Sequence, residues 1–318
     1  MGQEQTYEEE FEIKDDEEKT VVKEVLSWFY KNIKFLLIPG SRIDELTYRE
    51  IEFEKLRSKR KFIRRFKSFL TIFGIILIFT IVSFAVFAPW ISPGSFDEAN
   101  GIFFNEWGPP SENNLLGQTK FGRDVLTRLI WGARSSLTIA LPAIIFSVFF
   151  GVIIGVISAY YGGWVDSIIM RIMDMFLAIP SILLAIAIVS ALRPSLMNLM
   201  ISVGISSVPS YARIVRASVL SIRDQEFVEA ARAIGAKDKR IIMKHIIPNA
   251  LAPVIVQGTL GVAGAILSTA GLSFIGLGIQ PPAPEWGAML SNGRQYLRYA
   301  PHVTTFPGIA IMITILAL

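Results

Sequence analysis

The chain has 318 residues, of which 52% are apolar and only 18% are charged. Soluble domains carry about 25% charged residues, so this composition indicates a protein that is embedded in a membrane. The absence of cysteine excludes disulfides, cysteine-based metal sites and a thiol nucleophile. We interpret the net charge of +4 as basic residues gathered beside a bilayer and not as a nucleic-acid surface.

Residues 1–68 are predicted to form a cytoplasmic N-terminal extension in front of the first apolar stretch. Its first part, 1–18, is acidic and typical of a disordered tail. Apolar residues at helical spacing over 19–40 then predict an amphipathic helix that lies on a membrane surface, on a partner or on its own domain. A basic run at 57–67 flanks the first span, which is expected to act as an uncleaved anchor.

The remaining chain is predicted to be an all-α integral membrane protein with about six transmembrane helices. The predicted spans are residues 69–88, 137–160, 172–192, 197–217, 250–273 and 305–318. The fourth span contains Pro209, Arg213 and Arg216 in its second half. The sixth is shorter than the roughly twenty residues that a full crossing needs, so we expect the last helix to be truncated.

The distribution of basic residues predicts a cytoplasmic N-terminus. In this orientation the inside segments are 1–68, 161–171 and 218–249, and the outside segments are 89–136, 193–196 and 274–304. The inside segments carry about twice as many basic residues near the membrane as the outside segments, which favours this orientation. The expected organisation is the extension 1–68, a first transmembrane helix 69–88, an extracytoplasmic loop 89–136 and a membrane core 137–318 that includes the cytoplasmic segment 218–249.

The segment 218–249 has the pattern of two short helices around a glycine. Residues 227–234 favour a helix, and Gly235 is expected to end it because glycine adopts positive φ without strain. A basic helix at 237–247 follows, and Pro248 opens the next span. One interpretation is a compact docking surface for another protein, and the other is an ordinary loop with helical content.

Charged residues near the inner ends of the spans are interpreted as structural. Arg171 lies three residues before Asp174, which predicts a local ion pair or an interfacial placement for both, and Asp166 is expected to lie at the same interface. In the fifth span, Gly258, Gly261 and Gly264 recur every three residues. Small residues at this spacing allow neighbouring helices to pack closely.

The cytoplasmic segment resembles the EAA loop of ABC importer permeases, whose pattern is E-A-A-x3-G-x9-I-x-L-P. The residues that carry the resemblance are Glu229, Ala230, Ala231, Gly235, Ile247 and Pro248. The chain departs from the pattern at two positions, because His245 replaces the first isoleucine and Ile247 replaces leucine. His245 has no second histidine nearby, so we expect it to be packed or interfacial and not to bind a metal.

Further motifs resemble the C-type permease subunit of the oligopeptide, dipeptide and nickel importers, and together they cover about residues 69–318. They are Leu116–Thr119, Gly122–Leu126, Gly132–Arg134, Gly162–Asp166, Ile179–Ser181, Leu272–Gly278, Pro281-Pro282 and Pro284–Gly287. The resemblance implies the type I ABC importer architecture. It does not include the extension 1–68, which is longer than the usual N-terminus of this family.

The resemblance also implies partners for the chain. They are a second, distinct permease subunit in a heterodimer, two ATPase subunits that take up the EAA loop, an extracytoplasmic substrate-binding protein and the lipid of a prokaryotic cytoplasmic membrane. ATP and magnesium would be held by the ATPase subunits, so no cofactor or metal is expected in this chain. In this family the fifth span would line the path, which makes Gly258, Gly261, Gly264 and Ser268 possible path residues, although helix packing explains them equally well.

No catalytic residue is predicted. The stretch from Gly117 to Gly122, followed by Arg123 and Asp124, lacks the lysine and the serine or threonine that a nucleotide-binding loop requires. We expect Arg123 and Asp124 to cap or orient the following helix, or to touch the binding protein.

Peptides are the substrate that the resemblance implies, with nickel or sugar as alternatives within the same group. A secondary transporter would show internal repeats or ionisable groups at mid-membrane, and neither is found. A membrane enzyme is disfavoured because no cluster of catalytic groups occurs. A third alternative is a membrane anchor whose N-terminal extension is the functional part. We keep it only as a further docking or regulatory role of residues 1–68 beside the transport function.

Overall fold

The computed structural model describes residues 69–103 and 107–318, so the predictions for the extension 1–68 lie outside the described residues. Residues 72–318 form one compact unit. Across the described ranges the secondary structure is helical, apart from one isolated bridge between Gln118 and Asp124. The prediction of an all-α membrane protein is therefore confirmed.

The helices follow one another in three groups. The first group is α3 (Phe69–Val86), α4 (Ala88–Ile91), α5 (Phe96–Asn100), α6 (Val125–Tyr161), α7 (Gly163–Leu177), α8 (Ser181–Leu192) and α9 (Leu196–Ile222). The second is α10 (Glu226–Ala233), α11 (Asp238–Ile241), the π-helical turn η1 (Ile242–Ile246) and α12 (Ile247–Phe274). The third is α13 (Trp286–Gly293), the 3₁₀ turn η2 (Arg294–Tyr296) and α14 (His302–Ala317).

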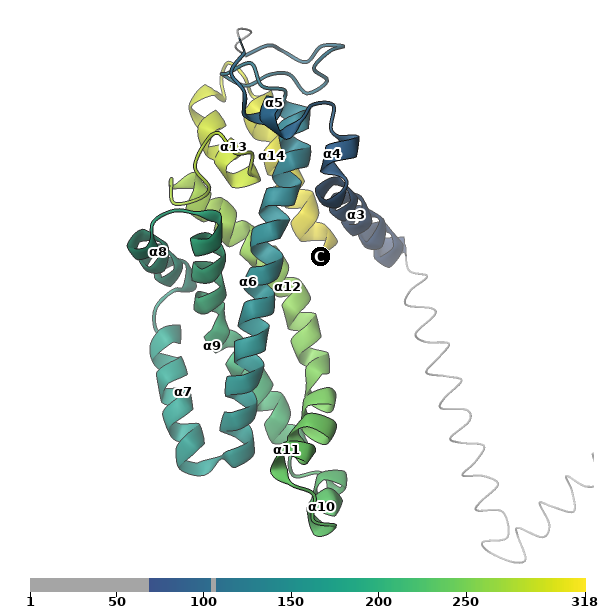
Figure 1. The fold of residues 1–318 in the computed structure, drawn as a ribbon, viewed down its shortest axis with the longest axis vertical. Helices are drawn as coiled ribbons and strands as arrows, with labels where there is room; N and C mark the ends of the chain where they lie inside the picture. The colour runs from purple at the N-terminus through teal and green to yellow at the C-terminus, as the bar shows by residue number, and fades with distance from the viewer. Residues whose placement is uncertain (1–68, 104–106) are drawn as a thin grey trace, which may run out of the picture. The chain divides into compact units, whose positions relative to one another are not determined.

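Three long helices, α6, α9 and α12, pack against one another and form the centre of the bundle (Figure 1). Their contact is apolar, with Ile139, Leu199 and Ile266 among the side chains that are almost completely buried. Helices α7 and α8 pack on α9, while α13 packs between α12 and α14. The short helices α10 and α11 lie at one end of the bundle and α13 lies toward the other (Figure 1).

Helix α6 has defined caps at both ends. The carboxylate of Asp124 accepts a hydrogen bond from the Thr127 backbone N–H at 2.7 Å, which satisfies one of the free donors of the first turn. Arg123 Nε donates to the Gly101 carbonyl at 2.5 Å. The helix ends at Gly162, which has φ +64°. The predicted capping role is confirmed for Asp124, whereas the Arg123 bond reaches the residue that ends α5.

Helices α6 and α9 approach each other closely because α6 presents glycines at the contact. A Cβ on Gly151 would lie 2.5 Å from Tyr211 Cβ, and a Cβ on Gly155 would lie 2.5 Å from the Ala212 carbonyl oxygen. A side chain at either position therefore requires the two backbones to separate. Without a strong hydrophobic force between helices in lipid, such close packing is a main source of helix association.

Three helical stretches of the described chain are long and apolar enough to cross a membrane. They are Phe69–Val86, Val125–Tyr161 and Asp238–Phe274. Helix α9, at the predicted fourth span, has 27 residues and is less apolar on average than these three. The last helix, α14, is a shorter apolar helix of 16 residues.

The third predicted span, 172–192, is wrong as one continuous helix. Helix α7 ends at Leu177, and α8 begins at Ser181 with its axis turned by 84°. Taken together, the two helices are long and apolar enough to form one membrane span, but this span is bent. The break has a local cause, because Pro180 lacks an N–H group and disfavours the helical conformation in the residue before it.

The predicted local pair between Arg171 and Asp174 is also wrong. Asp174 pairs with Arg213 of α9 at 2.7 Å, and Asp166 pairs with Arg216 through two bonds of 2.6 and 2.5 Å. The Ser158 hydroxyl also donates to Asp166. Sequence spacing favoured the neighbour on the same helix, whereas the packing of α7 on α9 brings the arginines of the other helix within reach.

We predict that Gly155→Ala destabilises the protein and that Gly264→Ala, the same change on α12, does not. The Cβ at position 155 meets backbone atoms of α9, whereas no atom of the described residues lies within 4 Å of a Cβ at position 264. Overpacking of this kind costs about 1–3 kcal/mol. Thermal unfolding in detergent, followed by size-exclusion chromatography, measures the difference, and equal midpoints for the two variants would contradict the close approach.

We predict that Arg216→Ala lowers the free energy of unfolding more than Arg213→Ala. The Arg216 and Asp166 side chains are 32% and 17% exposed, whereas those of Arg213 and Asp174 are 58% and 56% exposed. Losing hydrogen bonds to a half-buried charge costs about 1.5–3 kcal/mol, and losing an exposed pair costs about 0–1 kcal/mol. Unfolding of both variants in a denaturing detergent series tests the ranking, which a larger effect at Arg213 would refute.

Candidate functional site

The segment 223–246, between α9 and α12, holds Glu229, Ala230, Ala231 and Gly235 of the EAA-like pattern. In helix α10, Val228 and Ala231 are buried in an apolar cluster with the adjoining ends of α6, α9 and α12. Glu229 and Ala230 lie on the opposite, exposed side. The segment thus has one face that fixes it to the bundle and one face that is open to a partner.

Gly235 ends helix α10 with a left-handed turn. It has φ +80°, its N–H donates to the Arg232 carbonyl at 2.9 Å, and the Ala236 N–H donates to the Ala231 carbonyl at 3.0 Å. These two bonds form the Schellman motif, in which glycine is strongly preferred at this position. In the part of the chain that the structure describes, no atom lies within 4 Å of a Cβ on Gly235, so the requirement for glycine there is conformational and not a matter of space.

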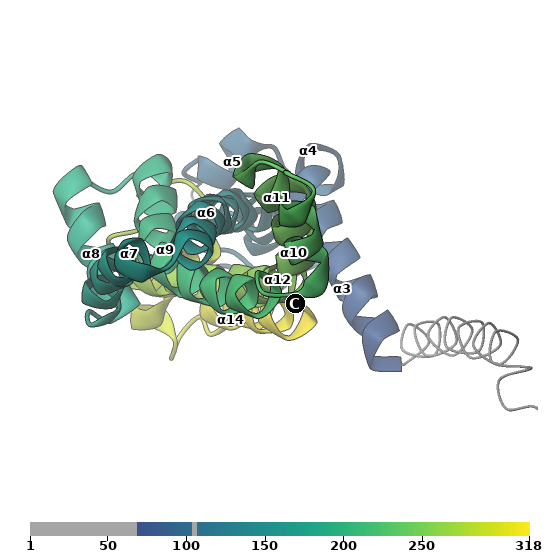
Figure 2. The same ribbon diagram turned by 90° about the horizontal axis from the view of Figure 1, so that it is seen from below.

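The turn presents an exposed apolar side chain. Ile234 is 86% exposed directly before Gly235, and Phe227, at the start of α10, is 39% exposed. Exposed large apolar residues beside small exposed ones such as Ala230 are typical of protein interaction sites. This surface lies at the end of the bundle that Figure 2 views.

Polar contacts tie the segment to helix α6. The Tyr160 hydroxyl donates to Asp238 Oδ1 at 2.7 Å, and the Arg232 guanidinium lies 5.6 Å from the centre of the Tyr160 ring. Arg223 donates to the Ala159 carbonyl at 2.6 Å. Tyr160 and Asp238 were not predicted as functional residues, because they are 78 positions apart and only the fold brings them together.

The second half of the pattern, Ile247 and Pro248, forms the first turn of α12. Proline is well placed there because the first N–H groups of a helix have no partner within it. The preceding π-helical turn buries Ile246 and places the His245 ring 6.4 Å from the Phe227 ring. His245 was predicted to be packed or interfacial, and its ring is partly buried beside that of Phe227. All six residues of the predicted pattern therefore belong to one connected surface element or to its junction with α12.

A cavity of about 210 Å³ lies among α6, α8, α9 and α12. Three of the four predicted path residues line it, namely Gly261, Gly264 and Ser268. Gly258 does not line it, and a Cβ there would meet Val148 of α6 at 3.8 Å. Gly258 therefore lies outside the cavity lining, whereas Gly261 lies at the cavity wall in close contact with Tyr211, where a Cβ would come within 1.9 Å of the tyrosine hydroxyl.

The remaining polar lining of the cavity was not predicted. It consists of Ser181, Ser206, Ser207, Ser210, Tyr211 and Gln257. The Tyr211 hydroxyl donates to the Gln257 carbonyl at 3.2 Å, which links α9 to α12 at the cavity wall. The sequence feature that could have identified this lining is the group of serines three and four residues apart, which places them on one side of the helix. Polar groups inside a membrane protein face its interior or a water-filled space, which makes this cavity a functional candidate.

Comparisons with known proteins agree with this arrangement. Residues 151–318 match the family described as the binding-protein-dependent transport system inner membrane component. The chain is 48% identical over 250 residues to a dipeptide transport system permease protein of Alkalihalophilus pseudofirmus, covering 79% of this chain and 82% of the relative. It is 41% identical over 263 residues to a glutathione transport system permease protein of Escherichia coli, covering 81% and 85%.

A solved structure shares the fold. The inward-facing methionine ABC transporter MetNI matches with a TM-score of 0.51 at 20% identity, covering 59% of this chain and 89% of the matched chain. The predicted type I importer architecture is confirmed by this likeness together with the family match. The chain belongs to the binding-protein-dependent transport system inner membrane components, the permeases of ABC importers, and within them to the group that contains the dipeptide and glutathione permeases.

Proposed function

We propose that this chain forms half of the path of an ATP-driven importer that carries short peptides into a prokaryotic cell. The relatives that carry dipeptides and glutathione support the substrate class, since they match across about four fifths of the chain. The hydroxyl groups and the amide within the largely apolar lining of the cavity can form hydrogen bonds with a solute that is itself rich in amide groups. The second half of the path would come from a distinct permease subunit.

We propose further that the segment 223–246 receives an ATPase subunit. The observation that carries this proposal is the exposed face of α10, where Glu229, Ala230 and Ile234 project away from an apolar base. Small side chains allow a partner to come close, and the capped turn at Gly235 fixes the end of the helix. A push on α10 would be transmitted to α6 through Tyr160 and to α12 through Pro248.

In this arrangement α10 lies on the cytoplasmic side and α13 on the outer side. The N-terminus is then cytoplasmic, and the ATPases approach from the side that holds ATP. A binding protein delivers the peptide at the opposite end of the bundle. ATP-driven closure of the two ATPase subunits would move the two coupling segments together and switch the permeases between two rigid-body states.

The function is tested by reconstitution. The chain is co-purified with the products of the neighbouring transport genes and placed in proteoliposomes, and uptake of a labelled dipeptide is measured. We expect uptake that requires ATP and the binding protein together. Uptake that follows an ion gradient without ATP would instead establish a secondary transporter.

We predict that Gly235→Val reduces ATPase association and peptide-stimulated ATP hydrolysis, whereas Gly235→Asn largely retains both. A left-handed conformation costs an ordinary residue about 1–2 kcal/mol, and asparagine adopts it far more readily than a β-branched residue. A cost of this size lowers the population of the correctly formed turn relative to its alternatives by about 5- to 30-fold. Equal activity of the two variants would mean that the turn at Gly235 does not position the docking helix.

We predict that Gly264→Leu blocks peptide uptake while Gly258→Leu leaves it largely intact. A leucine at position 264 enters the polar cavity without meeting other atoms at its Cβ, whereas position 258 faces α6 outside the cavity. Uptake and assembly of the complex are measured for both variants. If Gly258→Leu is the more damaging substitution in correctly assembled complexes, the cavity is not part of the path.

A further inference from the structure

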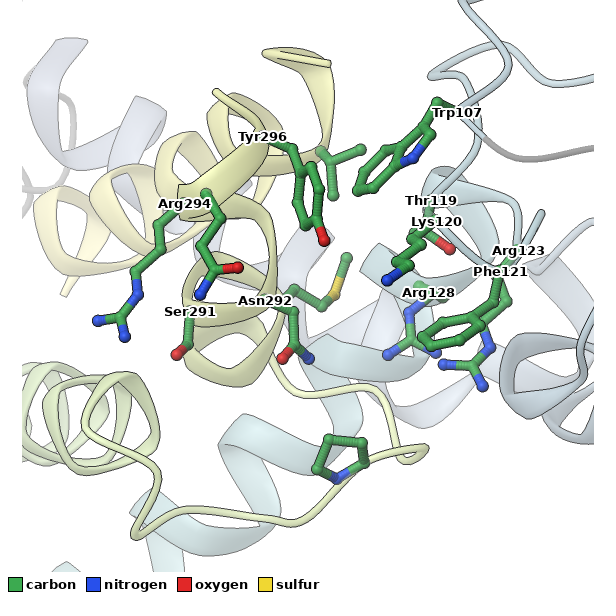
Figure 3. Close-up of a pocket in the computed structure, with 14 residues that line it drawn as sticks. Trp107, Thr119, Lys120, Phe121, Arg123, Arg128, Ser291, Asn292, Arg294 and Tyr296 are labelled. Atoms are coloured by element: carbon green, nitrogen blue, oxygen red, sulfur yellow. The ribbon is translucent and has the colours of Figure 1, made fainter. Parts of the chain in front are cut away.

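The end of the bundle opposite α10 holds a larger pocket, of about 440 Å³ (Figure 3). One wall comes from the loop before α6 and from the first turn of that helix, including Lys120, Arg123 and Arg128. The other wall comes from α13 and η2, including Asn292 and Tyr296. In Figure 3 the side chains of these two segments face each other across the open space.

Positive charge gathers on one wall of this pocket without a matching carboxylate. Arg128 donates to the carbonyls of Ala99 and Pro282, Arg123 donates to the carbonyl of Gly101, and Lys120 lies 5.9 Å from the centre of the Tyr296 ring. None of these three cations forms an ion pair with a carboxylate of the residues that the structure describes. Burial lowers the pKa of the Arg123 guanidinium, yet the ordinary guanidinium pKa is so high that the group keeps its charge at neutral pH.

Two aromatic rings, Trp107 from the loop before α6 and Tyr296 from η2, line the pocket, and the backbone of Trp107 has an unusual conformation. Trp107 has φ +58°, a left-handed conformation that a residue of this size rarely adopts, and its ring centre lies 4.2 Å from that of Tyr296. The hydroxyl of Thr119, in the same lining, is buried and has no hydrogen-bond partner among the described residues. Strained backbone that the surroundings hold in place is found most often at binding sites and other functional sites.

The pocket is separate from the proposed path. It shares no lining residue with the polar cavity among α6, α8, α9 and α12. Both of its walls come from segments that charge distribution predicts to be outside the cell. An occupant that arrives from the outside and does not enter the path is therefore favoured over the cargo itself.

We propose that this pocket receives an acidic side chain of the extracytoplasmic binding protein when that protein docks on the permease. The proposal rests on the proposed import function. A carboxylate is the group that complements Lys120 at the open part of the pocket, with the buried charges of Arg123 and Arg128 behind it. Tyr296 and Trp107 provide a rigid aromatic surface beside the carboxylate, and the amide of Asn292 offers a further hydrogen bond at the rim.

Charge reversal at Lys120 tests this inference. ATP hydrolysis by the complete complex in nanodiscs is titrated with the purified binding protein. We expect Lys120→Glu to raise the concentration of binding protein needed for half-maximal stimulation by at least about fivefold, because a rim charge mainly affects association. Raising the salt concentration should weaken docking of the wild type and narrow the difference between the two proteins.

The matched control is Arg298→Glu, the same charge reversal at an exposed residue that does not line the pocket. It should leave both the basal hydrolysis and the half-maximal concentration unchanged. If Lys120→Glu does not assemble, Lys120→Gln replaces it, with a smaller shift expected in the same direction. Equal half-maximal concentrations for the Lys120 variant and the control would overturn the proposal while leaving the importer intact, whereas a wild-type complex that no binding protein stimulates would contradict the importer itself.

A second measurement identifies the source of the carboxylate. Docking of the binding protein to the complex is compared with and without bound peptide. A loss of docking in Lys120→Glu that is already present without peptide supports an acidic side chain of the protein. A loss that occurs only with peptide bound would assign the pocket to the cargo and overturn the inference.

Discussion

The close approach of α6 and α9 is the constraint on which the rest of the structure depends. It is possible because Gly151 and Gly155 carry no side chain where Tyr211 and Ala212 come nearest. With these two backbones fixed, Tyr211 reaches α12 and forms a wall of the polar cavity. The same approach sets the ends of α6 and α9 side by side, which creates the apolar base on which α10 lies.

Two buried polar side chains, Ser147 and Glu285, find hydrogen-bond partners within the bundle, which matters in a chain surrounded by lipid. The Ser147 hydroxyl lies 2.8 Å from the carbonyls of Ala143 and of Gly204, so it links α6 to α9. Glu285, only 1% exposed, accepts hydrogen bonds from the backbone of α13 and from the Ser136 hydroxyl. An unpaired buried carboxylate is strongly unfavourable, so these contacts fix α13 on α6 and thereby hold the aromatic side of the outer pocket.

The two ends of the bundle differ in chemistry in a way that suits two different partners. One end presents α10, where small and apolar side chains are exposed above a well-packed base, as expected for a partner that pushes on the helix. The other end presents cations around an open space, which suits electrostatic recognition of a partner that associates and leaves. Helix α6 is common to both ends, with Arg128 in its first turn and Tyr160 in its last.

The sequence alone determined the class of protein, three of its long apolar helices and the position of the α10 segment, because hydropathy, sequence motifs and the requirement for glycine at position 235 are local properties. It did not determine the 84° break after α7, since Pro180 lay within a continuous apolar run. It also misassigned Asp174, because ion pairing is decided by which helices pack together and not by spacing along one helix. Only the tertiary structure placed Gly261 and Gly264 at the cavity and Gly258 outside it. It also brought Lys120 close to the Tyr296 ring, 176 positions away. Both results depend on the relative placement of segments that are distant in sequence.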